Sequence, residues 1–184
     1  LGGHPVFSAY FEGNMGYRRD KTVAVATGQE PQSMYMVTRG DHVNGGCCFD
    51  YGNAETDARD HGAGTMEAIY WGNSTGWSRG QGKGPWVMAD IENGLWAGKD
   101  KVSAAPSIDA DFVTAMAKGY AGGFQLKGGD AQKAGALATL YSGPRPPHYN
   151  PMRKQGAIIL GIGGDNSDWA VGTFCEGVMA RGFS

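Results

Sequence analysis

The amino-acid sequence predicts a single all-β domain, and three features support this prediction. Glycine makes up 32 of the 184 residues, more than twice the usual frequency of about 7%, and glycine at this density favours turns and loops over long helices. The 5 Trp, 8 Tyr and 7 Phe residues argue against a disordered chain, because such chains contain few aromatic side chains. The third feature is a series of short strand-like runs separated by Gly-, Asn-, Asp- and Pro-rich connections, which is typical of a β-sandwich or barrel.

Seven of these runs are predicted to be strands. In chain order they cover residues 33–38, 65–71, 85–91, 112–117, 137–141, 157–162 and 173–179. Two segments are ambiguous: 112–118 could form a short helix, and 131–139 is rich in Ala, although nearby glycines count against a long helix there. No internal repeat and no linker-like stretch divides the chain, so we expect one domain over residues 1–184.

Composition also argues against several classes of function. The 16 basic and 18 acidic residues give a net charge of −2 and form no basic stripe, so nucleic acid is not an expected partner. No apolar run approaches the roughly 18 residues of a membrane-spanning helix, and we expect a soluble protein. The chain begins with Leu1 and shows no signal sequence, which suggests a processed product or a piece of a longer chain. The prediction that the protein is exported therefore depends on two other features: the glycosylation candidate Asn73 and the adjacent pair Cys47 and Cys48.

The segment 85–93 carries two carboxylates that could belong to an active site. Side chains alternate along a strand, so the apolar odd-numbered residues would face the core, whereas Trp86, Asp90 and Glu92 would share the opposite face. The two acids would then lie roughly 6.5 to 7 Å apart along the strand. An aromatic ring beside carboxylates suits a sugar site, because the ring packs against C–H groups and carboxylates accept hydroxyl hydrogen bonds or attack the anomeric carbon. A solvated polar face is the alternative.

The segment 156–166 contains a further candidate catalytic acid, Asp165. Its apolar run is typical of a strand buried on both faces, and Gly163 and Gly164 after it allow a tight turn or a close approach to a ligand. Asp165 would therefore lie at the end of a rigid element, where partial removal from water would raise its pKa and suit it to protonate a leaving oxygen. The alternative is an Asx-turn, in which Asp165 only binds its own backbone.

The adjacent cysteines Cys47 and Cys48 allow two interpretations. They could be separate packing residues, or in an oxidising compartment they could close a vicinal disulfide, which is a stiff and apolar platform. Cys175 has no partner in either case and is expected to be a buried free thiol.

Five blocks of the sequence match a known family. They are CCFDYGNAET (47–56), GTMEAIYWGNSTGW (64–77), GPWVMADIENGLW (84–96), YNPMRKQGAIILGIGGDNS (149–167) and GTFCEGVM (172–179). Together they closely resemble the catalytic domain of glycoside hydrolase family 54, the fungal-type α-L-arabinofuranosidase B enzymes. The resemblance implies a β-sandwich of concanavalin-like, jelly-roll character and retaining hydrolysis of terminal α-L-arabinofuranosides.

The resemblance also implies a role for each matching residue. Glu92 would be the nucleophile and Asp165 the general acid/base, with carboxyl groups about 5 to 5.5 Å apart. The other matches are substrate-binding positions: Asp90, Asn93, Trp77, Cys47, Cys48 and Gly164. In the family the two cysteines form a vicinal disulfide that packs against the arabinose ring, the tryptophan borders the pocket, and the glycine contacts the substrate through its backbone. No metal or other cofactor is implied.

The expected protein is a secreted enzyme that releases arabinofuranose from plant cell-wall arabinan or arabinoxylan through a covalent arabinosyl-enzyme. Family catalytic domains carry a further N-terminal portion, and commonly a C-terminal arabinose-binding β-trefoil, so this chain is expected to be a partial catalytic domain. Two other functions stay open: a lectin-like module that binds arabinose without hydrolysis, and a structural piece of an extracellular assembly. Intact Glu92 and Asp165 argue against a module kept for binding alone. The sequence predicts no oligomeric state.

Overall fold

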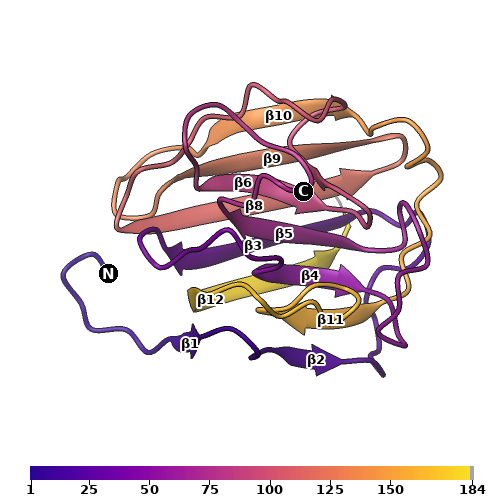
Figure 1. Ribbon diagram of the computed structural model, residues 1–184, viewed down its shortest axis with the longest axis horizontal. Coiled ribbons are helices and arrows are strands. Elements are labelled where there is room, and N and C mark those ends of the chain that lie inside the picture. Colours follow the sequence, from indigo (N-terminus) through magenta and orange to yellow (C-terminus); the bar gives the residue numbers. More distant parts are fainter. Residues whose placement is uncertain (183–184) are drawn as a thin grey trace.

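The protein is a β-sandwich. A computed structural model describes residues 1–182, and within them twelve strands form two antiparallel sheets of six strands each (Figure 1). Sheet A has the spatial order β1 (Ala9–Phe11), β12 (Gly172–Arg181), β3 (Gln32–Arg39), β8 (Phe112–Tyr120), β9 (Gly123–Asp130) and β10 (Ala138–Pro144). Sheet B has the order β2 (Tyr17–Arg19), β11 (Ala157–Leu160), β4 (Asp50–Ala54), β5 (Glu67–Gly72), β6 (Trp86–Asp90) and β7 (Leu95–Trp96).

The main core fills the space between the two sheets. Strands β5 and β6 of sheet B contact β8 and β9 of sheet A, and Figure 1 shows the two layers overlapping with their strands running across the view. Alternate residues of β8 are buried, because successive side chains on a strand point to opposite faces. On β6 the odd-numbered Val87 faces sheet A, since its Cγ2 lies 3.2 Å from the place a Cβ would take on Gly128 of β9.

The opposite, outer face of sheet B is also buried. Every residue of β5 and β6 is buried, because the connections between strands fold back over this face. Trp86, for example, is 1% exposed, and its indole Nε1 donates a hydrogen bond to the carbonyl of Gln81 in the β5–β6 connection at 2.8 Å. Side chains that point outward from sheet B therefore lie beneath loops, where a protected cavity can form.

All seven predicted strands are present, within a few residues of their expected limits. The short helix considered for 112–118 is wrong, because that segment belongs to β8. Five strands were not predicted: β1, β2, β4, β7 and β9. Strand β11 differs from expectation in its burial, since Ile158 and Leu160 are partly exposed while Ala157 and Ile159 are buried. None of the described residues forms a helix long and apolar enough to cross a bilayer.

Candidate active site

A cavity of about 110 Å³ lies over the outer face of sheet B, where five connections between strands meet. It is lined by Cys47, Cys48, Asp60, Met66, Trp77, Asp90, Glu92, Asn93, Gly94, Leu95, Gly163, Gly164, Asp165 and Ser167. This set includes all eight residues to which the sequence assigned a catalytic or sugar-binding role. The fold therefore brings together positions that are up to 118 residues apart, from Cys47 to Asp165 (165 − 47).

Glu92 reaches this cavity from a tight turn and not from a strand. Strand β6 ends at Asp90, and Glu92 and Asn93 follow with backbone φ angles of 69° and 55°. The expectation that Glu92 continues the alternation of the strand is therefore wrong. Its backbone N–H donates to Asp90 Oδ1 at 3.1 Å, so the turn holds both carboxyls at the cavity. Left-handed φ values are uncommon for residues other than Gly, and such strain clusters at functional sites.

The aromatic side chain at the site is Trp77 and not Trp86. Sequence alternation placed Trp86 beside the carboxylates, but its ring is buried beneath the β5–β6 connection and does not line the cavity. Trp77 comes from that same connection and is 48% exposed at the cavity rim. A half-exposed indole offers an apolar surface to a ligand that enters from solvent.

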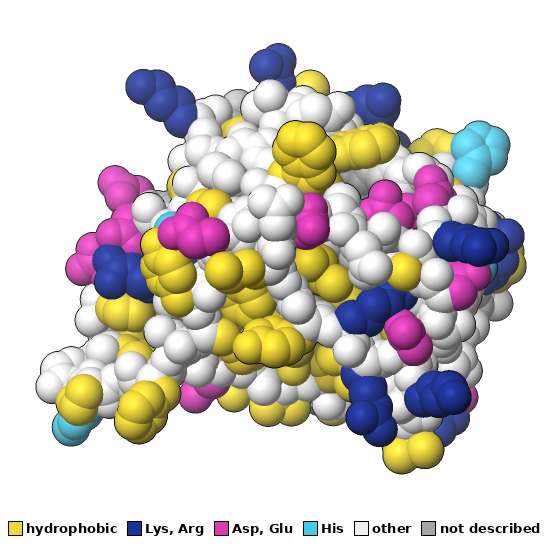
Figure 2. Space-filling view, turned by 60° about the horizontal axis from the view of Figure 1, so that its bottom comes forward, with side chains coloured by type: hydrophobic (Ala, Val, Ile, Leu, Met, Phe, Trp, Pro, Cys, Tyr) yellow, Lys and Arg dark blue, Asp and Glu magenta, His cyan; other side chains and the backbone are white. Residues whose placement is uncertain are grey.

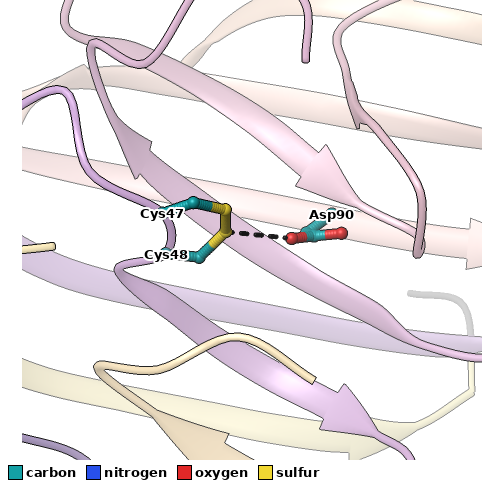
Figure 3. Close-up of side chains that lie close together, drawn as sticks. All are labelled: Cys47, Cys48 and Asp90. Atoms are coloured by element: carbon teal, nitrogen blue, oxygen red, sulfur yellow. Dashed lines mark hydrogen bonds between the residues drawn. A yellow bond between two sulfur atoms is a disulfide. The ribbon is translucent and has the colours of Figure 1, made fainter. Parts of the chain in front are cut away.

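The adjacent cysteines form a sulfur platform against Asp90. Cys47 and Cys48 are joined by a disulfide, and Cys48 Sγ lies 3.4 Å from Asp90 Oδ2, as Figure 3 shows. The two sulfurs and a carboxylate oxygen of Asp90 lie within 4.8 Å of one another, as the ligands of a metal ion would. Sulfurs in a disulfide, however, lack the thiolate charge that binds metal ions. The cluster therefore presents an apolar surface next to a carboxyl, an arrangement that suits one face and the hydroxyls of a sugar ring.

The turn after β11 carries the second predicted catalytic acid. Asp165 is exposed, and its Oδ1 accepts a hydrogen bond from the backbone N–H of Ser167 at 2.9 Å, which is the Asx-turn considered as the alternative. The expected desolvation of this carboxyl is therefore wrong. Gly164 before it has no room for a side chain, because a Cβ there would lie 2.8 Å from Met66 Sδ and 2.9 Å from Glu92 Oε2. Glycine at this position lets the turn approach the cavity floor closely.

Two buried carboxyls form the floor of the site. Asp50 on β4 is completely buried, and neither of its carboxyl oxygens has a hydrogen-bond partner among the described residues. Burial, followed by the negative charge of Asp90, raises the pKa of Asp50 well above its usual value. Burial also raises the pKa of Asp90 to about 7. Two neighbouring carboxyls can form a hydrogen bond with each other only when one of them carries a proton.

Glu92 is the cavity residue whose pKa is raised to about 10. It is only 7% exposed, and burial is the main cause of this raised pKa, with further increases from the negative charges of Asp90 and Glu55 and from a hydrogen bond to the Glu55 side chain. A strongly perturbed carboxyl in a cleft marks a functional-site candidate. Glu92 therefore belongs to a group of closely spaced, buried acids.

Sequence reasoning missed four charged residues of this site. Asp60 lines the cavity and accepts a hydrogen bond from Asn93 Nδ2 at 3.1 Å. Asp50 and Glu55 lie beneath it and are fully buried. Arg18 on β2 donates to the carbonyls of Gly164, at 2.8 Å, and Glu55. The buried acids sit at the two ends of β4, a strand that the sequence did not reveal, so no local pattern pointed to them.

Two other predicted features lie outside the cavity. Asn73 is half-buried, and its Oδ1 is buried without a hydrogen-bond partner among the described residues, so its glycosylation stays a prediction. Cys175 is a free thiol as predicted, but it is only partly buried, which differs from the expectation. Burial raises its thiol pKa.

Comparison with known proteins identifies relatives over the whole chain. Residues 1–184 match the family model described as α-L-arabinofuranosidase B, catalytic. The chain is 54% identical to the α-L-arabinofuranosidase B of Aspergillus niger over 187 aligned residues, which cover 100% of this chain and 37% of that protein. It is 52% identical to the α-L-arabinofuranosidase of Hypocrea jecorina, with the same coverage. The chain thus spans little more than a third of the length of these curated relatives.

Solved structures show the same fold at the same level of identity. An arabinofuranosidase complexed with arabinofuranosyl-α-1,2-xylobiose superposes with a TM-score of 0.93 and 52% identity, over 96% of this chain and 37% of that one. A family 54 enzyme soaked with a cyclic sulfate inhibitor superposes with a TM-score of 0.94 and the same identity and coverage. The β-sandwich predicted from the sequence is confirmed, and the chain belongs to the family of α-L-arabinofuranosidase B catalytic domains, glycoside hydrolase family 54.

Proposed function

We propose that this chain carries the active site of a retaining glycoside hydrolase that releases terminal α-L-arabinofuranose, with Glu92 as nucleophile and Asp165 as general acid/base. The observation that carries the proposal is the contrast between the two carboxyls within one cavity. Glu92 is 7% exposed, whereas Asp165 is exposed. Two carboxyls in unlike environments are the usual arrangement for the two roles in glycoside hydrolysis.

The proposed reaction has two steps. In the first, a carboxylate oxygen of Glu92 bonds to the anomeric carbon while the glycosidic bond breaks, and Asp165 gives its proton to the departing oxygen. The product is an arabinosyl ester of Glu92. In the second step, the ionised Asp165 takes a proton from water, the water oxygen bonds to the anomeric carbon, and the ester bond breaks. The exposure of Asp165 suits this role, because both the leaving group and the water must reach it.

The other cavity residues would bind the sugar. Asp90 and Asn93 offer an acceptor and a donor for ring hydroxyls, and the disulfide faces the same space. Trp77 at the rim would pack against C–H groups. The ligands in the related structures, an arabinofuranosyl xylobiose and an inhibitor of the enzyme, support an arabinose-containing carbohydrate as the substrate class.

We also propose that the protein acts on plant cell-wall polysaccharide outside the cell. A disulfide such as Cys47–Cys48 persists in oxidising compartments. On the face seen in Figure 2, Lys and Arg side chains are interspersed with Asp and Glu. The mixed charge of this face is compatible with a neutral carbohydrate partner.

Stereochemistry and leaving-group dependence test this proposal. The full-length protein should hydrolyse 4-nitrophenyl α-L-arabinofuranoside, and proton NMR should show the α-anomer as the first product. Asp165→Asn should slow substrates with poor leaving groups far more than activated aryl substrates, because only the former need protonation. The matched control is Asp168→Asn, since Asp168 lies three residues further along and does not line the cavity.

Three outcomes would overturn the proposal. A first product of β configuration would mean inversion. Equal slowing of good and poor leaving groups by Asp165→Asn would remove the acid role. Binding of arabinofuranosides without turnover by the full-length protein would instead support the lectin-like module.

A further inference from the structure

Glu55 is a buried acid directly behind the proposed nucleophile. It follows the last residue of β4 and is fully buried, but it does not line the cavity. Its Oε1 accepts a hydrogen bond from the hydroxyl of Thr65, and its backbone carbonyl accepts one from Arg18. Its Oε2 is buried and has no donor from a hydroxyl, amide or cationic group among the described residues. A buried polar atom without a donor is costly unless something else satisfies it.

The group that meets this oxygen is the carboxyl of Glu92. The Oε2 atoms of Glu55 and Glu92 both lie within 2.9 Å of the place that a Cβ would take on Gly164, so the two carboxyls face each other beside this glycine. Two carboxylates without a proton can only accept hydrogen bonds, so a bond between them requires one proton. A hydrogen bond between these two facing carboxyls would thus join one acid and one carboxylate.

The surrounding charges keep this proton in place. Asp90 and Asp60 face Glu92 and disfavour a second negative charge there. The nearby cation Arg18 uses its N–H groups on two backbone carbonyls, on Asn166 and on Asp20. No salt bridge to Glu55 or Glu92 exists within the described residues. Burial among acids raises the pKa of Glu92, in agreement with a shared proton.

We propose that Glu55 is a positioning residue for Glu92: it takes the shared proton and donates it in a hydrogen bond to the Glu92 carboxylate. This inference rests on the proposed function of Glu92. The proton moves along the existing hydrogen bond from Glu92 to Glu55, which leaves Glu92 anionic and ready to form the ester, while no proton enters or leaves the site. When the ester breaks, Glu92 returns as a carboxylate to the same donor. One oxygen of the nucleophile is thereby fixed and the other faces the cavity.

Two substitutions separate this role from simple packing. Glu55→Gln keeps a donor for Glu92 but cannot exchange a proton, whereas Glu55→Leu keeps a similar volume and offers no donor. We expect Glu55→Leu to lower kcat at least 100-fold with KM within threefold, and to move the acidic limb of the profile of kcat/KM against pH upward by at least one unit. Glu55→Gln should lower kcat by less than tenfold and leave the acidic limb in place. The matched control is Glu67→Gln, a buried acid of the same sheet that lies outside the cavity, and it should not move the limb.

A readout that needs no catalysis keeps the inference independent of the proposed function. Infrared difference spectra of the full-length protein at pH 8 should contain one protonated carboxylic acid band that both Glu55→Gln and Glu92→Gln remove. Asp50→Asn should leave this band in place and remove the separate band of Asp50, the other buried acid with a raised pKa. If this band disappears but Glu92→Gln leaves turnover within tenfold of wild type, the proton pair is real and the nucleophile assignment fails. If the band persists in Glu55→Gln, or if Glu55→Leu leaves the acidic limb unmoved, the role proposed for Glu55 is wrong. Should Glu55→Leu not fold, the infrared comparison still decides.

Discussion

Sheet B buries carboxylates on both of its faces, and the two faces differ in whether cations pair with these carboxylates. On the face toward sheet A, Glu67 is paired with two cations: Arg145 Nη2 lies 3.2 Å from one oxygen and Lys154 Nζ lies 3.1 Å from the other. All three side chains are no more than 2% exposed. On the outer face, Asp50 and Glu92 lie beneath or within the cavity and have no salt bridge among the described residues.

We interpret Glu67 as an acid that serves the fold, and the cavity acids as those that serve the proposed catalysis. A buried charge must be compensated, and a pair of cations does this permanently for Glu67. The acids of the cavity have no such cations, and burial raises the pKa values of Asp50, Asp90 and Glu92, so that protonation removes their charge instead. A shared proton can be moved during a reaction, whereas a salt bridge fixes the charge in place. We infer that the cavity acids reduce stability in exchange for reactivity.

Removing the structural acid should have the largest effect on stability. Glu67→Ala would leave Arg145 and Lys154 as uncompensated buried cations, and we expect the free energy of unfolding to fall by about 3–5 kcal/mol. Urea denaturation followed by tryptophan fluorescence measures this change. A loss below about 1 kcal/mol would show that water reaches these cations and that the comparison between the two faces does not hold.

Removing the Arg18 side chain should reduce stability by an intermediate amount, because it connects Glu55 to the turn after β11. Its guanidinium is largely buried and joins the carbonyl of Glu55 to the turn that carries Asp165. We expect Arg18→Ala to destabilise the protein by about 1.5–3 kcal/mol, the usual range for hydrogen bonds to a charged group, and to lower kcat/KM about tenfold. Arg19→Ala on the same strand is the matched control, since within residues 1–182 the side chain of Arg19 donates only to the nearby carbonyl of Lys21. Equal effects of the two substitutions would refute this role.

Asp50→Asn should change the free energy of unfolding least, and the size of this change should depend on pH. The folded protein raises the pKa of Asp50 above the unfolded value of about 3.9, so the stability of the wild type falls as pH rises above that value. Asparagine keeps a donor toward Asp90 and does not ionise. The variant should therefore match the wild type near pH 4 and be more stable by about 1 kcal/mol or more at pH 9.

An acid with the opposite shift provides the control for this experiment. Solvent-facing Asp130 has a lowered pKa, chiefly because it accepts the backbone N–H of Gln132. Its contribution to stability is present above the unfolded pKa, so Asp130→Asn should lose stability relative to the wild type as pH rises. If thermal melts show that the Asp50→Asn difference is independent of pH, Asp50 is not a buried acid with a raised pKa.

The sequence predicted the architecture well where strands have regular apolar patterns. Strands β3, β8 and β12 contain long runs of this kind and were located correctly. Strand β9 was missed because three of its eight residues are Gly, and β4 was missed because Gly52 and Asn53 weaken its β-propensity. Short edge strands such as β1 and β2 leave almost no signal in three residues.

The site was predicted mainly through the family resemblance, and residue patterns alone went wrong in specific places. Alternation put Trp86 at the sugar site, because it cannot show that the β5–β6 connection folds back over that ring. The desolvation expected at Asp165 failed since the turn after β11 projects its side chain into solvent. Glu55 and Arg18 were missed because their roles depend on partners 37 positions apart in sequence. No local spacing records such contacts.

The central claim is that Glu92 attacks the sugar, and covalent labelling tests it most directly. The full-length protein should be incubated with an arabinofuranose-configured cyclic sulfate, the class of inhibitor found with a related family 54 enzyme, and then digested and sequenced by tandem mass spectrometry. We predict one inhibitor per protein on the peptide that contains Glu92, attached as an ester to that side chain, and no labelling after Glu92→Gln. A label on Asp165 or Glu55, or undiminished labelling of the Glu92→Gln variant, would contradict the account.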